Sequence, residues 1–247
     1  MNQYIKYIDK SKVEYAYLIG SYSRNEHNEF SDIDIICALK DGLSTFSDNK
    51  FIDGVYVSVH YDSQLDMIGN YTDPHKYIMG HVGIKDMVVI YDPGNLVTNF
   101  KEKCMKIDYF YEFSNKINDY VNKETIEWIE EVNKSVNGYI YFNPTKMLEG
   151  LHGLTYGMLS VLSVSEGIIQ TKYGLLPTYK EYFIDENVYK LLENAFGVTK
   201  LDIKERIYNG LLFYKEIIKI IEYRFDEKTV FNIELALNNI KKVIKEV

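Results

Sequence analysis

Two acidic residues near the start of the chain are the residues best suited to carry chemistry. Asp32 and Asp34 stand two residues apart at the start of an apolar run. Residues at that spacing in a strand lie on the same face, so both carboxylates would point the same way. Neighbouring carboxylates repel each other, and a divalent cation removes that penalty. Because Mg²⁺ takes a few carboxylates together with nucleotide phosphates, the pair predicts a Mg-nucleotide site.

A glycine-serine pair upstream is suited to hold a phosphate beside these carboxylates. Gly20-Ser21 ends an apolar run, and glycine lets the backbone approach an anion closely because it has no Cβ. A helix starting after Ser21 would direct free N–H groups at that anion. Gly-Ser and Asp-x-Asp are each common alone, but an apolar strand into Gly-Ser, a basic residue and then Ser-Asp-x-Asp is far rarer. We therefore interpret the combination as functional.

Short strands must position these residues. The candidates are residues 14–20, 32–39, 54–63 and 86–95, the last stopped by an Asp-Pro-Gly turn signal. In 54–63 the alternation is strict, and it places Ser58, His60 and Asp62 on the face opposite the valines. The first hundred residues therefore read as strands separated by turns.

The pattern becomes helical after Asn95. Apolar residues at 110, 113, 117, 120 and 121 fit one face of a helix. Further helical patterns cover 124–136, 145–169, 186–196, 204–225 and 230–247. We predict an α+β protein with an N-terminal mixed-sheet domain, residues 1–105, followed by a C-terminal helical bundle domain, residues 106–247.

Composition excludes several classes of partner. With 28 basic and 36 acidic residues the net charge is -8, and no Lys/Arg cluster is present to neutralise phosphates, so we expect no nucleic-acid partner. A cationic small molecule would suit the charge better. No apolar run is long enough to span a bilayer, so we expect no membrane partner. Two cysteines cannot form a disulfide framework and nothing marks export, so we expect a cytoplasmic protein.

Gly20-Ser21 followed by Asp32-x-Asp34 resembles the signature of the DNA polymerase beta-like nucleotidyltransferase superfamily. The similarity extends to the kanamycin (aminoglycoside 4′-O-) nucleotidyltransferases through Ile90-Tyr91-Asp92 and Asn143-Pro144-Thr145. The resemblance implies a nucleotidyltransferase domain followed by a helical substrate-binding domain. It also implies a homodimer, because the family's active site lies between subunits.

The resemblance assigns roles to single residues. Asp32 and Asp34 would be catalytic and would hold Mg²⁺, which bridges the phosphates of ATP or another NTP. Ser21 would bind a terminal phosphate, and Arg24 would help neutralise its charge. The nucleotide-binding residues would be Gly20, Ser21, Arg24 and Ser31.

Glu131 matches the glutamate that serves the kanamycin enzymes as general base toward the sugar hydroxyl, on the helix before the Pro144 turn. The alternative is a solvated helix face with Glu–Lys pairs such as Glu130 with Lys134. The family has a lysine four residues after this glutamate, and here that position is Ser135. No residue is therefore assigned as the cation near the α-phosphate.

Ser58 is a departure from the family, which places a third carboxylate in this slot between two β-branched residues. Serine adds no negative charge, so we expect weaker metal affinity and one possible base fewer. Asp62, on the same face, would reach the metal only if the strand bent or its register slipped.

His60, His81 and Glu127 are the candidates for the acceptor pocket. His75 and His81 are expected to flank a turn around Asp73-Pro74. No histidine joins another histidine or a cysteine at the spacing of zinc ligands, so we expect no zinc site.

The leading hypothesis is an enzyme that moves a nucleoside monophosphate, AMP first, from a Mg-NTP to a hydroxyl of a small molecule and releases pyrophosphate. The resemblance implies an aminoglycoside-like antibiotic as acceptor. The alternative, favoured by Ser58, is a nucleotide-binding protein of the same fold with weak or no turnover and a regulatory or antitoxin-like role. A third hypothesis is the same chemistry on a protein or a tRNA, and the lack of a basic groove counts against tRNA.

Overall fold

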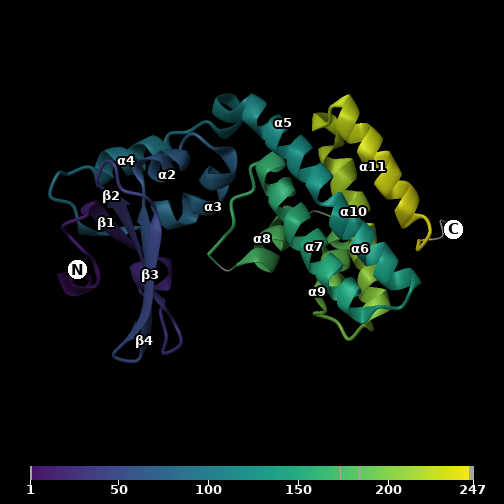
Figure 1. Ribbon diagram of the computed structural model, residues 1–247, viewed down its shortest axis with the longest axis horizontal. Helices are drawn as coiled ribbons and strands as arrows, with labels where there is room; N and C mark the ends of the chain where they lie inside the picture. The colour runs from purple at the N-terminus through teal and green to yellow at the C-terminus, as the bar shows by residue number, and fades with distance from the viewer. Residues whose placement is uncertain (1, 173, 184, 245–247) are drawn as a thin grey trace. The chain divides into compact units, whose positions relative to one another are not determined.

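The computed structural model describes residues 2–172, 174–183 and 185–244 (Figure 1). The chain divides into two compact units, Met1–Glu112 and Phe113–Val247. The described strands all belong to the first unit, and the second is built from helices. The predicted α+β fold class, a mixed sheet followed by a helical region, is confirmed. Among the described residues, no helix combines the length and the apolarity that crossing a membrane requires.

The first unit is a sheet flanked by short helices. Its strands are β1 (Val13–Ile19), β2 (Ile33–Leu39), β3 (Phe46–Ile52), β4 (Val55–Asp62) and β5 (Val88–Tyr91). Its helices are η1 (Asn2–Tyr7), α1 (Gly20–Ser23), α2 (Gln64–Gly69), α3 (Pro74–Lys85) and α4 (Val97–Met105), and α5 (Tyr109–Glu127) contains the boundary between the units.

The strands pair in the order β3-β4-β2-β1-β5, with β2 and β4 parallel and the other pairs antiparallel. Alternating side chains divide the sheet into two packed faces. One face gathers Leu18, Ile35 and Val57, with tyrosines of η1 packed against it. The other gathers Tyr15, Tyr17 and Ala38 under α2, α3 and α4, and Figure 1 shows these three helices close together over the sheet.

The prediction that the first hundred residues are strands separated by turns was wrong where α2, α3 and α4 form. His75 and His81 lie within α3 and do not flank a turn. Asp73 caps this helix by accepting the Lys76 N–H, and Pro74 occupies its first turn. Both features favour a helix start, because an N-cap satisfies a free N–H and proline lacks one.

β3 was not predicted, because its residues are mostly exposed and lack an apolar face. It pairs with β4 through a two-residue turn at Asp53-Gly54, where both residues have positive φ, of 53° and 82°. Asp-Gly with these angles is the usual chemistry of a type I′ hairpin turn. The turn fixes the register, so that Asn49 pairs with Ser58.

The second unit packs its helices around α7 and α10. Its elements are α6 (Ile129–Ile140), α7 (Pro144–Glu166), α8 (Leu175–Tyr182), α9 (Glu186–Phe196), α10 (Ile203–Ile221), η2 (Glu222–Arg224) and α11 (Glu227–Ile240). The predicted helical stretch 124–136 is interrupted at Trp128, where α5 ends and α6 begins. Glycines 150, 153 and 157 of α7 face α6 so closely that a Cβ on Gly153 would lie 2.6 Å from Cγ of Glu131. The three glycines thus allow close packing of α7 against this segment.

Candidate functional site

The turn after β1 brings Gly20 against a carboxylate. Ile19 pairs with Asp34 across the β1–β2 ladder, and the chain then turns at Gly20 with φ of +72°. A Cβ on Gly20 would lie 2.9 Å from Oδ2 of Asp34. Glycine is required here twice, because other residues rarely adopt this φ and because a side chain would collide with the carboxylate. The glycine-serine bend and the second aspartate therefore face each other.

The helix expected after Ser21 is a single turn. It covers Gly20–Ser23, and the chain leaves helical pairing at Arg24. The Ser23 hydroxyl closes the turn by donating to the carbonyl oxygen of Gly20 at 2.8 Å. The Ser21 hydroxyl has no hydrogen-bond partner in the described chain. Any bound anion would thus meet the N–H groups of this one turn together with the Ser21 hydroxyl.

Asp32 and Asp34 form a close acidic pair at the start of β2. Asp34 is half-buried, whereas Asp32 precedes the strand and is exposed. Burial raises the pKa of Asp34, and the nearby Asp32 charge raises it further, while His60 acts in the opposite direction. A cation between the two carboxylates would relieve both penalties. These oxygen ligands fit Mg²⁺, which binds one or two carboxylates plus phosphates.

The pair has no third protein ligand. Within the described ranges, no group of three or more histidine, cysteine, aspartate or glutamate side chains could hold a metal ion. Ser58 is the direct neighbour of Asp34 in the parallel β2–β4 ladder, so serine does occupy the position beside the acidic pair. The Ser58 hydroxyl donates to Oδ1 of Asn49 at 3.1 Å and lies 3.2 Å from Nε2 of His60. A neutral, hydrogen-bonded group thus stands where another carboxylate would add charge.

Asp62 cannot replace the missing carboxylate. The β2–β4 register pairs it with Ala38, without the slip that a metal contact would need. It lies four residues beyond Ser58, which is about 13 Å along a strand. Asp62 shares the sheet face of Asp34 but lies too far away to bind the same cation.

Arg24 is already paired. Its Nε lies 2.8 Å from Oε2 of Glu26, and Nη1 lies 3.8 Å from Oδ2 of Asp86. Ser31, the other residue expected near the nucleotide, accepts the N–H of Asn28 at 3.0 Å. A phosphate would have to share the guanidinium with Glu26 and Asp86.

His81 is half-buried on α3. Its Nδ1 has no hydrogen-bond partner in the described chain, and its ring meets that of Tyr77 edge-on at 5.0 Å. Burial lowers the pKa of His81, and the Lys85 charge lowers it further. The neutral imidazole is therefore favoured, and no described contact joins it to the acidic pair.

The remaining candidates belong to α5 and α6. The Glu131 side chain is 16% exposed, and its Oε1 lies 2.7 Å from Nζ of Lys134. The predicted Glu130–Lys134 pair is also present, at 2.9 Å. Lys134 donates hydrogen bonds to these two carboxylates, which raises its pKa. Glu127 is exposed and pairs with Lys123 at 3.5 Å. Glu131 thus has the Glu–Lys pairing expected of a solvated helix face, but its side chain is more buried than such a face would make it.

Sequence reasoning missed Asn49 and Asp86. Asn49 touches Ser58, and Asp86 touches Arg24. The Asp53-Gly54 turn was a usable signal for Asn49, because a two-residue hairpin places it opposite Ser58. No local signal links Asp86 to Arg24, because that contact depends on how α3 packs against the sheet.

Comparisons with known proteins agree with this geometry. Residues 2–94 match the family model for "Polymerase beta, Nucleotidyltransferase". The fold resembles that of a nucleotidyltransferase-like protein from Exiguobacterium sibiricum, with 11% identity and a TM-score of 0.53 over 94% of this chain and 77% of that one. No curated protein matches the sequence.

At this identity the structural likeness shows the fold alone, whereas the family match covers the segment that carries Gly20, Asp32 and Asp34. Residues 2–94, within the N-terminal unit, thus match the polymerase beta nucleotidyltransferase family.

Proposed function

We propose that the chain transfers a nucleoside monophosphate, AMP first, from a Mg-NTP to a hydroxyl of a small molecule and releases pyrophosphate. The observation that carries the proposal is the approach of Gly20 to Asp34, with Asp32 beside it. This arrangement offers two oxygen ligands next to a bend with free N–H groups. Phosphoryl chemistry of this kind needs chiefly positioning and charge neutralisation.

Each residue of the turn has a distinct part in the proposed reaction. Asp32 and Asp34 would hold Mg²⁺, which neutralises the nucleotide phosphates when bound. The Gly20 backbone gives the phosphate access, and the Ser21 hydroxyl donates to its terminal oxygens. Arg24 would add positive charge once a phosphate competes with its carboxylate partners.

Glu131 is the proposed general base. Its carboxylate would accept the proton of the attacking hydroxyl, a contribution of about 10²–10⁴-fold in rate. Lys134 donates a hydrogen bond to this carboxylate at 2.7 Å and so restrains its position. Glu131→Gln should therefore lower turnover more than nucleotide affinity.

The resemblance to the kanamycin nucleotidyltransferases supports the finer parts of the proposal. These are an aminoglycoside-like acceptor and hence a role in antibiotic resistance, a homodimer, and a substrate-binding role for the helical domain, residues 106–247. The proposed cytoplasmic location rests instead on the two cysteines, which cannot form a disulfide framework. His60, His81 and Glu127 are proposed to line the acceptor pocket.

Pyrophosphate release tests the proposal. The full chain is incubated with Mg-ATP, or with another Mg-NTP, and a panel of hydroxylated acceptors that includes aminoglycosides. Asp32→Asn and Asp34→Asn should each abolish release, whereas Asp41→Asn, in an exposed turn, should not. Retained turnover in either active-site variant would refute the metal assignment.

A second candidate function is nucleotide binding without turnover, in a regulatory or antitoxin-like role. The neutral Ser58 beside Asp34 favours it, because the acidic pair lacks the charge of a third carboxylate. Mg-ATP binding by calorimetry, without pyrophosphate across the whole acceptor panel, would select this function over the first.

A further inference from the structure

A small cavity lies between the sheet and α3. Its volume is about 100 Å³, and β1, β2, β4 and α3 all contribute to its walls. Gly80 and Gly83 of α3 leave the space open, and Ile19 and Ile36 line the sheet side. A liquid water occupies about 30 Å³, so the cavity has room for a small head group.

Asp62 is a carboxylate without a partner in this cavity. It is half-buried, and no hydrogen bond or ion pair joins its side chain to any described residue. Burial raises its pKa, and the nearby Asp66 raises it further, while His60 and Lys76 lower it without contacting it. Burying an unpaired charge costs free energy, so a buried carboxylate without a partner is a candidate for binding a ligand or for another function.

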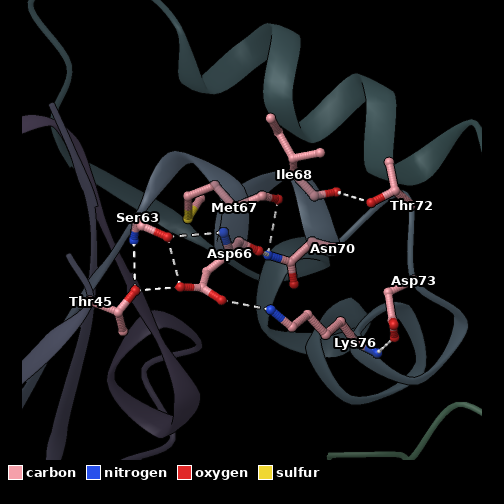
Figure 2. Close-up of polar contacts among 9 residues, drawn as sticks. All are labelled: Thr45, Ser63, Asp66, Met67, Ile68, Asn70, Thr72, Asp73 and Lys76. Carbon is pink, nitrogen blue, oxygen red and sulfur yellow. Dashed lines mark hydrogen bonds and ion pairs between the residues drawn. The ribbon is translucent and has the colours of Figure 1, made fainter. Parts of the chain in front are cut away.

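The lysine whose charge acts on Asp62 is engaged elsewhere. Figure 2 shows Lys76 directed to Asp66, with Nζ 2.7 Å from Oδ1. Asp66 also accepts from the hydroxyls of Ser63, at 2.8 Å, and Thr45. These bonds hold the pKa of Asp66 well below its usual range. Lys76 is thereby fixed to Asp66, and Asp62 is left without a counter-charge.

Asn70 offers a further acceptor to the cavity. The Asn70 amide nitrogen donates to the carbonyl oxygens of Met67 and Asp66, at 3.3 and 3.4 Å (Figure 2). Its Oδ1 lies on the side of Gly80, where a Cβ would come within 2.6 Å of it. Asp62 and Asn70 thus present acceptors to the cavity. Its isoleucine walls offer no donor, and the hydroxyl of Tyr17, which also lines it, is a donor without charge.

We propose that this cavity binds a protonated primary amine, whose N–H groups donate to the Asp62 carboxylate and to Oδ1 of Asn70. An ammonium group supplies the missing charge and up to three donors, and its carbon stem suits the apolar walls. The amine is either a free small molecule or an amino group of a larger one. The site does not depend on nucleotide transfer at Asp32 and Asp34.

The test follows the backbone amide signals of Gly80 and Gly83 in heteronuclear NMR spectra of the full chain. Methylammonium is titrated as the free amine and glucosamine as an amine on a larger molecule. Tetramethylammonium, which has the charge but no N–H donor, is the control. We expect saturable shifts with at least one of the two primary amines and none with tetramethylammonium.

Three variants separate the cavity from general effects. Asp62→Asn should weaken amine binding at least tenfold, because a charge-assisted hydrogen bond is lost. Gly83→Ala should weaken it too, because the methyl group fills the cavity yet meets Ile19 at an ordinary 3.5 Å. The exposed Asp41→Asn should bind like the wild type.

Saturation with methylammonium would identify a free amine, and saturation with glucosamine alone would identify an amino group on a larger molecule. Absence of saturable shifts with both amines would overturn the proposal, as would equal affinity in Asp62→Asn. Asp32→Asn should lose Mg-ATP binding and keep amine binding, so failure of the proposed enzyme function would be distinguishable.

Discussion

Replacing Gly20 by alanine tests the contact on which the proposed nucleotide site rests. The variant has two separate consequences. Alanine must adopt a φ of +72°, and its Cβ would stand 2.9 Å from Oδ2 of Asp34. The first affects the free energy of unfolding, and the second affects the position of a proposed metal ligand.

The two effects differ in size and in target. A left-handed conformation costs a non-glycine residue about 1–2 kcal/mol, which should appear as lost stability. The Asp34 carboxylate must retreat by roughly half an ångström or more to reach an ordinary contact distance. The carboxylate can move cheaply because it ends a flexible side chain, so the collision adds little to the unfolding cost. A misplacement approaching 1 Å can cost about 10²-fold in rate, so we expect Mg-ATP turnover or affinity to fall about 10–100-fold.

Gly42→Ala is the matched control. Gly42 has a similar φ of +81°, and a Cβ there would meet nothing within 4 Å. Urea unfolding should therefore give both variants a similar loss of stability. Calorimetric titration with Mg-ATP should show a large loss for Gly20→Ala and a near-normal affinity for Gly42→Ala.

Near-normal Mg-ATP affinity in both variants would refute the reasoning. It would mean that the contact between Gly20 and Asp34 is a packing detail and that the nucleotide binds elsewhere. Equal loss of affinity in both would instead trace the defect to the stability of the unit as a whole.

Three further variants test other parts of the structure. Ser58→Asp should lower the Mg²⁺ concentration needed for half-maximal nucleotide binding. Without Mg²⁺, repulsion between the new carboxylate and Asp34 should lower the free energy of unfolding. An unchanged Mg²⁺ requirement would contradict the assigned position of Ser58 beside the metal site. Because the pKa of Asp62 is raised, the free energy of unfolding of the wild type falls as pH rises through that pKa. Asp62→Asn should therefore be more stable than the wild type at pH 7, and this advantage should shrink toward pH 3. Equal stability of the two proteins at every pH would show that the Asp62 charge does not destabilise the fold. Gly157→Ala places a methyl group into the Trp128 indole and should cost about 1–3 kcal/mol in urea unfolding, whereas a neutral result would mean that α6 and α7 can separate freely.

Local patterns predicted the strands whose alternation is visible. β2, β4 and β5 lie within predicted runs, β1 begins one residue before its predicted run, and the Ser58 face of β4 is as expected. β3 was not predicted because an exposed edge strand needs no apolar face, although the Asp53-Gly54 turn marked its end. α3 was not predicted because Asp73-Pro74 begins helices as readily as it forms turns.

Side-chain alternation assigns a residue to a face of a sheet, and only strand pairing assigns it to a neighbour. Alternation in the sequence placed Asp62 on the face of Ser58, and it left open whether Asp62 could share a cation with Asp34. The parallel register answers this by setting Ser58, and not Asp62, beside Asp34. Long-range strand pairing thus leaves Asp34 in the acidic pair and Asp62 alone in a cavity. We therefore expect these two aspartates, on the same face of the sheet, to bind different ligands, a metal ion and an amine.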